Sequence, residues 1–122
     1  MSLILLVDDD DLFRKMLRIT LVKMGHKVVE ARDGKEAINL FKQKLPDLVL
    51  TDILMPKFDG LETTHALREI NPNVKIVVMS AGGGYSTDLL NMGQQLGANH
   101  SMRKPFTDQE LTATLAELLS EA

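Results

Sequence analysis

The 122-residue sequence contains no cysteine, and this absence excludes several kinds of chemistry at once. Disulfide cross-links, thiolate zinc sites, iron–sulfur clusters and a cysteine nucleophile all require a thiol. The lack of thiols fits a reducing compartment, and we expect the protein to be cytoplasmic. An apolar core must therefore hold the fold, and a chain of this length can bury roughly two-thirds of its unfolded surface.

The sequence also lacks a basic excess and a long apolar run. Its 14 lysines and arginines are outnumbered by 17 aspartates and glutamates, and no basic stripe stands out, so direct nucleic-acid binding is not expected. The longest apolar run covers residues 3–7, far short of the roughly 20 residues that a membrane-spanning helix needs. We expect no membrane insertion, and the length predicts one domain over residues 1–122.

Three short runs are almost continuously apolar, at residues 3–7, 48–50 and 76–79. Such runs are typical of parallel strands that helices cover on both faces. Two more polar segments, 27–31 and 99–103, fit strands at the edges of a sheet. Helical periodicity and capping signals predict helices after residues 11, 33 and 60, from residue 86 or 87, and after residue 107.

Strand and helix thus alternate five times along the chain. Parallel neighbours need crossover connections, and right-handed crossovers place helices on both faces of the sheet. With the two polar strands outermost, the strand order is 2-1-3-4-5. We therefore predict an α/β fold with a doubly wound five-stranded parallel sheet, the flavodoxin-like (βα)5 arrangement, whose ligand crevice lies at the carboxyl ends of the strands.

Five polar side chains follow or end the predicted strands, and parallel pairing would bring them into that crevice. They are Asp8, Asp9, Asp52, Ser80 and Lys104. Two carboxylates about 4 Å apart repel by roughly 4 kcal/mol at an effective dielectric constant near 20. A proton, a bound cation or the ammonium group of Lys104 must therefore compensate the carboxylates.

A carboxylate-rich site without thiols or imidazoles suits a hard ion such as Mg²⁺, and Mg²⁺ commonly accompanies phosphoryl groups. Lys104 can supply a point charge and Ser80 a hydroxyl donor for phosphoryl oxygens. Asp52, at the end of a central strand, can be the carboxylate nucleophile that forms an acyl phosphate.

Each of these residues also has a plain structural interpretation. Asp10 and Asp11 are better explained as an acidic helix start than as ligands, since anions favour a helix N-terminus. Asp52 by itself could end a strand in a turn, and Lys104 by itself could be a solvated charge. The three histidines show no metal-binding spacing, and we expect them to be surface or packing residues.

Taken together, the motifs are more specific than any one of them. In chain order they are Val7-Asp8-Asp9, Asp47-Leu48-Val49-Leu50-Thr51-Asp52, Met55-Pro56, Asp59-Gly60, Ser80-Ala81 and Lys104-Pro105-Phe106. This pattern resembles the receiver domain of two-component response regulators, in the right order over nearly the whole chain.

The resemblance implies that Asp52 accepts a phosphoryl group. Mg²⁺ would be held by Asp9, Asp52 and the main-chain carbonyl of Leu54, with Asp8 acting largely through water. Lys104 would pair with Asp52 at rest and with the phosphoryl group afterwards.

Ser80 would move to bond a phosphoryl oxygen, and this movement would alter the surface formed by the fourth helix, the fifth strand and the fifth helix. Pro105 would follow a cis peptide bond. These roles are implied by the family, not worked out from spacing.

The same resemblance implies the partners and the type of activity. The phosphoryl donor would be the phosphohistidine of a sensor histidine kinase or a phosphotransfer protein, and the output would pass to a downstream protein target or effector domain of unknown identity. Dimerisation on phosphorylation is a further expectation. The chain would not be an enzyme with an external substrate, although it would assist its own phosphorylation and slow dephosphorylation.

The sequence departs from the family pattern at two places. Ser101 stands where most members have an aromatic switch residue, and Gly82–Gly84 loosen the segment after the fourth strand. The same residues leave two alternative functions open. A Mg²⁺-dependent aspartyl phosphatase usually has a second acid two residues after its nucleophile, where this chain has Leu54. A degenerate receiver that only binds proteins would not need all five site residues.

Overall fold

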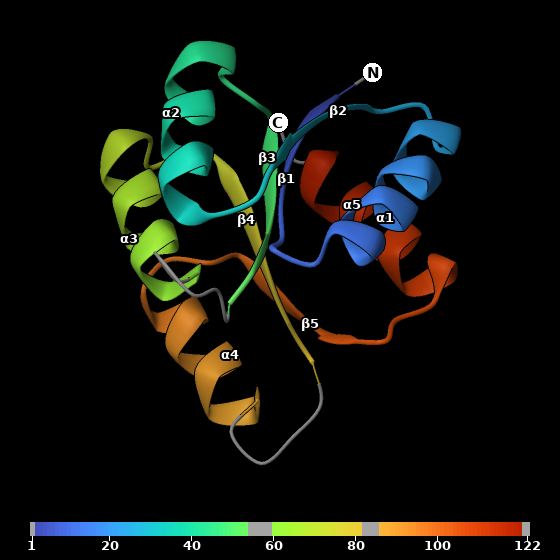
Figure 1. Ribbon diagram of the computed structural model, residues 1–122. Coiled ribbons are helices and arrows are strands. Elements are labelled where there is room, and N and C mark those ends of the chain that lie inside the picture. Colours follow the sequence, from blue (N-terminus) through green and yellow to red (C-terminus); the bar gives the residue numbers. More distant parts are fainter. Residues whose placement is uncertain (1, 54–59, 82–85, 121–122) are drawn as a thin grey trace.

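The computed structural model describes residues 2–53, 60–81 and 86–120. Within these ranges, strands and helices alternate from β1 to α5 along the chain (Figure 1). The elements are β1 (Leu3–Val7), α1 (Asp11–Lys23), β2 (Lys27–Ala31), α2 (Gly34–Lys44), β3 (Leu48–Asp52), α3 (Gly60–Ile70), β4 (Lys75–Ala81), α4 (Ser86–Gln95), β5 (His100–Lys104) and α5 (Asp108–Leu119).

The five strands form one parallel sheet in the order β2-β1-β3-β4-β5, which confirms the predicted topology. The strand bounds differ from the sequence prediction in one informative way. β3 and β4 each extend two residues further at the carboxyl end than the apolar runs indicated, to Asp52 and Ala81, and β5 runs to Lys104. Backbone pairing continues past the last apolar residue, so polar site residues belong to the strands themselves.

Helices cover both faces of the sheet (Figure 1). One core cluster joins one sheet face to α2, α3 and α4, with Phe41 and Leu67 fully buried. The other joins the opposite face to α1 and α5, through residues such as Leu21 and Leu111. β1 and β3 contribute to both clusters because alternate side chains point to opposite faces. None of the helices within the described ranges is long and apolar enough to cross a membrane.

Within the described residues, side-chain caps begin α1, α2 and α5. Asp10 accepts from the Phe13 amide at 3.1 Å, and Asp11 lies in the first turn of α1, so both residues form the acidic helix start that the sequence predicted. Asp33 caps α2 and Thr107 caps α5 in the same way. Each such cap contributes about 1 kcal/mol by satisfying an amide at the helix start.

His26 lies in the turn between α1 and β2, and its burial makes folding sensitive to pH. Its Nδ1 is buried and has no hydrogen-bond partner within the described part of the chain. Burial lowers the pKa of His26 below its usual value of 6.5, because the charged imidazolium is poorly solvated there. At a pH just below 6.5 the unfolded chain therefore binds more protons at this residue than the folded chain does.

We expect the free energy of unfolding to fall as the pH drops from about 7 through 6.5 toward the lowered pKa of the folded state. His26→Gln should remove part of this slope because glutamine does not titrate. Urea unfolding at a series of pH values measures both profiles. Identical slopes for the two proteins would contradict the assignment to His26.

Candidate functional site

The polar residues singled out in the sequence lie at the carboxyl edge of the sheet. Asp8 follows the last residue of β1, and Asp52 ends β3. Ser80 lies one residue before the end of β4, and Lys104 ends β5. Because the strands are all parallel and paired in register, these ends share one edge.

Lys104 connects two of the carboxylates. Its Nζ lies 2.7 Å from Asp8 Oδ2 and 3.4 Å from Asp52 Oδ2. The family resemblance assigned Asp52 as its resting partner, whereas the shorter contact in the structure is with Asp8. The ammonium group also lies 4.1 Å from the centroid of the Phe13 ring, which adds a favourable cation–π contact. The Lys104–Pro105 peptide bond is cis, as the resemblance implied.

Every polar group of Asp8 has a partner, and the residue is fully buried. Its amide donates to the carbonyl of Ala31 in β2 at 3.1 Å, and its carbonyl accepts from Arg14 Nη1 at 2.7 Å. Oδ1 accepts from the Asp10 amide at 2.9 Å, while Oδ2 accepts from Lys104. The position of this carboxylate is therefore set by β2, α1 and β5 together.

Hydrogen bonds with the two neighbouring residues hold the side chain and the carbonyl of Asp52. Its Oδ1 accepts from the Ile53 amide at 2.8 Å, and its carbonyl accepts from Thr51 Oγ1 at 3.0 Å. The start of α3 packs directly against this segment, since a side chain at Gly60 would place its Cβ 2.3 Å from the Asp52 carbonyl oxygen. The fold thus needs a glycine next to the candidate nucleophile.

The three carboxylates can serve as ligands for one cation. One oxygen each from Asp8, Asp9 and Asp52 lies within 4.8 Å of the others. Asp8 and Asp52 are buried while Asp9 is exposed, so the group opens toward solvent on the side of Asp9. An all-oxygen, anionic donor set fits a hard divalent ion such as Mg²⁺, which keeps several waters when a protein binds it.

Ser80 shares this edge of the sheet and is almost fully buried. Its hydroxyl donates to the carbonyl of Ala81 at 3.2 Å, and its strand neighbours β3, the strand that ends in Asp52. The remaining positions of the predicted site lie outside the described residues: Leu54, Met55, Pro56, Asp59 and Gly82–Gly84.

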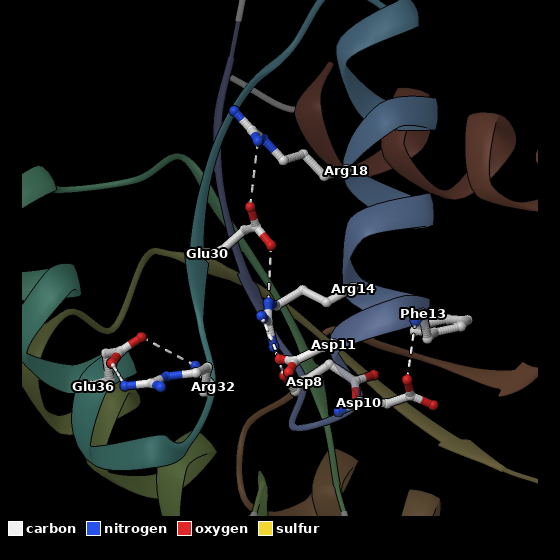
Figure 2. Close-up of polar contacts among 9 residues, drawn as sticks. All are labelled: Asp8, Asp10, Asp11, Phe13, Arg14, Arg18, Glu30, Arg32 and Glu36. Carbon is white, nitrogen blue, oxygen red and sulfur yellow. Dashed lines mark hydrogen bonds and ion pairs between the residues drawn. The ribbon is translucent and has the colours of Figure 1, made fainter.

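Arg14 takes part in this site although its place in the sequence did not single it out, because it lies off the apolar stripe of α1. The structure buries this residue to 6% exposure and turns its guanidinium toward Asp8 and Glu30 (Figure 2). The spacing of three residues between Asp11 and Arg14 is typical of an ion pair within one helix, and the two residues do pair at 2.7 Å. Its contact with Glu30 depends on how α1 packs against β2, which the periodicity of α1 does not reveal.

Residues 4–116 match the family model of the response regulator receiver domain. The chain belongs to this family. It is 39% identical over 95% of its length to the response regulator MprA of Mycolicibacterium vanbaalenii, and 37% identical over 98% to the transcriptional regulatory protein CpxR of Escherichia coli. The matches cover half of each of those proteins, so this receiver chain spans about half the length of the curated relatives that it matches.

Solved structures agree with this family assignment. The receiver domain of NtrX from Brucella abortus superposes with a TM-score of 0.92 at 26% identity, covering 98% of this chain and 99% of that one. The chemotaxis protein CheY4 of Vibrio cholerae superposes with a TM-score of 0.87 at 28% identity, covering 97% and 98%. The chain is a receiver domain of the two-component response regulators, and neither the aspartyl phosphatase nor the degenerate receiver is favoured.

Proposed function

We propose that this receiver domain is a phosphoacceptor in which Asp52 takes a phosphoryl group from a phosphohistidine with the help of Mg²⁺. One observation carries the proposal: the Lys104 ammonium lies between two buried carboxylates, within 2.7 Å of Asp8 and 3.4 Å of Asp52. A third carboxylate, from Asp9, lies close enough to share a cation with them.

The chemistry follows from these positions. A carboxylate oxygen of Asp52 attacks phosphorus, the bond from phosphorus to the histidine nitrogen breaks, and that nitrogen takes up a proton. Asp9, Asp52 and the Leu54 carbonyl would hold Mg²⁺, with Asp8 acting largely through water, and bound Mg²⁺ would supply positive charge for the phosphoryl oxygens.

Lys104 neutralises charge at the resting site and is within reach of a phosphoryl group placed on Asp52. After transfer, one carboxylate has become a group with nearly two negative charges and three acceptor oxygens. Ser80, on the neighbouring strand, can donate to one of these oxygens instead of to the Ala81 carbonyl. That exchange would shift the segment after β4 and bias the surface of α4, β5 and α5 between two conformations.

The experiment is incubation of the chain with Mg²⁺ and a small-molecule phosphodonor, followed by intact-mass measurement. We expect one labile phosphoryl group on the wild type and none on Asp52→Asn. Asp47→Asn is the matched control, because Asp47 precedes the same strand at its other end and its contact with the Leu3 amide can be kept by asparagine. Chelation of Mg²⁺ should also prevent the mass gain.

Other outcomes would contradict the proposal in different ways. A wild type that gains no phosphoryl group would be a degenerate receiver that only binds proteins. Rapid turnover of an external phosphomonoester would instead support an aspartyl phosphatase.

The partners of this proposed activity are a sensor histidine kinase or phosphotransfer protein as donor, and a downstream protein target or effector domain. MprA is named a response regulator and CpxR a transcriptional regulatory protein, and each is about twice as long as this chain. We also propose that the chain loses its phosphoryl group slowly and that it dimerises on phosphorylation. Its proposed location is the cytoplasm.

A further inference from the structure

The two peptide groups on either side of Asp9 are each held by a hydrogen bond. Arg14 Nη1 donates to the Asp8 carbonyl at 2.7 Å, and the Asp10 amide donates to Asp8 Oδ1 at 2.9 Å. Because a peptide group is planar, holding one of its atoms orients the whole group. Asp9 lies between the end of β1 and the start of α1. Its backbone is oriented by Arg14 and by the Asp8 side chain, and this orientation sets the direction of its exposed side chain.

Arg14 is itself fixed by contacts in several directions (Figure 2). Its Nε donates to Glu30 of β2 at 2.9 Å, and its Nη2 donates to Asp11 at 2.7 Å. Only 8% of its side chain is exposed. Burial opposes its charged form most strongly, but the contacts with Asp11 and Glu30 outweigh that effect and raise the pKa of Arg14, so it stays charged.

The charges around Arg14 balance one another. Arg18 lies 3.5 Å from the second carboxylate oxygen of Glu30, so two cations, Arg14 and Arg18, face two anions, Asp11 and Glu30. This set brings almost no net charge to the nearby acidic site. Removing the Arg14 charge would leave this set with one excess negative charge, which on electrostatic grounds favours a bound cation. A loss of cation affinity in an Arg14 variant would therefore come from the geometry of the Asp8 carbonyl.

We infer that Arg14 is a positioning residue for divalent-cation binding. Its guanidinium holds the Asp8–Asp9 peptide group in the orientation that brings the Asp9 carboxylate to Asp8 and Asp52. Glu30 assists by fixing the guanidinium. The inference rests on the proposed function, since it assumes that the three carboxylates bind a cation. Residues that orient metal ligands typically change metal affinity by about 10- to 100-fold when they are replaced.

The test is binding of Mn²⁺ alone to the 122-residue chain, measured from the electron paramagnetic resonance signal of the free ion. Arg14→Gln should weaken binding by at least about 10-fold. Arg14→Lys should weaken it similarly, because an ammonium group keeps the charge but not the planar fork that contacts three partners at once. Glu30→Gln should cause a smaller loss, and Arg32→Gln, an exposed arginine paired with Glu36, should bind as the wild type does.

A positioning role also predicts how phosphorylation responds to Mg²⁺. The Mg²⁺ concentration for half-maximal phosphorylation of Asp52 should rise in the Arg14 variants, while the rate at saturating Mg²⁺ stays within a few-fold of wild type. A general loss of structure would lower the saturated rate and the circular dichroism signal as well. If the Arg14 variants do not fold, Glu30→Gln, which keeps Arg14, decides the question.

The possible failures are distinguishable. Wild-type Mn²⁺ affinity in Arg14→Gln, or full rescue by Arg14→Lys, would overturn the positioning role while phosphorylation of Asp52 stands. If the Arg14 variants are unfolded, wild-type Mn²⁺ affinity in Glu30→Gln would overturn the positioning role. If the wild-type chain binds no Mn²⁺ and gains no phosphoryl group, the proposed function fails and this inference fails with it.

Discussion

Replacing Gly60 by alanine is expected to destabilise the protein by about 3 kcal/mol or more. The added Cβ would lie 2.3 Å from the Asp52 carbonyl oxygen and 2.5 Å from the Ile53 Cα. Both are backbone atoms, one in the last residue of β3 and one in the residue that follows it, so no side-chain rotation can relieve the overlap. Either α3 or the end of β3 must move, and the second movement would displace the Asp52 carboxylate.

Gly93→Ala is the matched control, because Gly93 also lies in a helix that packs against the sheet. The three atoms nearest to its Cβ would be side-chain atoms of Val78 and Ile53, at 3.1 Å and more, and these can adjust. Alanine also favours helix over glycine by about 1 kcal/mol, so the net change should be small. Urea unfolding compares the two variants, and equal stabilities would contradict the close approach of α3 to Asp52.

Lys104→Met is expected to cost about 3 kcal/mol, at the lower end of the range for breaking a buried ion pair. The variant leaves the fully buried Asp8 carboxylate near Asp52 without the ammonium group that lies between them. The cost is limited because the Lys104 side chain keeps 15% exposure, so water can reach part of the site. Urea unfolding of the variant against the wild type measures this cost.

Two controls separate charge from packing in this experiment. Asp8→Asn in the Lys104→Met background removes one of the remaining carboxylates and should recover part of the lost stability. Lys42→Met, at an exposed position in α2, should change stability by less than about 0.5 kcal/mol. If Mg²⁺ binds the three carboxylates, it should also stabilise Lys104→Met more than the wild type. A double variant no more stable than Lys104→Met would show that carboxylate repulsion is not the cause.

The strand order and the two-faced core follow from local sequence signals. Apolar runs at residues 3–7 and 76–79 can only be buried on both faces, and helical segments between them provide the cover. Caps such as Asp33 and Thr107 act over three residues, so their spacing is visible in the sequence. These features depend on neighbours along the chain, which is why they could be predicted.

The site could be predicted only as a set of residues at one edge of the sheet. Asp8, Asp52 and Lys104 were placed there because parallel strands end together. Lys104 contacts Asp8 across 96 positions of sequence, lies nearer to Asp8 than to Asp52, and packs over the Phe13 ring. The spacing of these residues along the chain does not predict which of the two carboxylates lies nearer to the Lys104 ammonium group.

By itself, the sequence determined which segments become strands and helices, their order in the sheet and which polar residues reach its carboxyl edge. Tertiary structure alone decided that Arg14 is buried, that Gly60 touches the backbone of Asp52 and that Lys104 lies nearer to Asp8. The physical reason is the range of the forces involved. Periodicity and capping act within a few residues, whereas these contacts depend on how separate helices and strands pack together to within about an ångström.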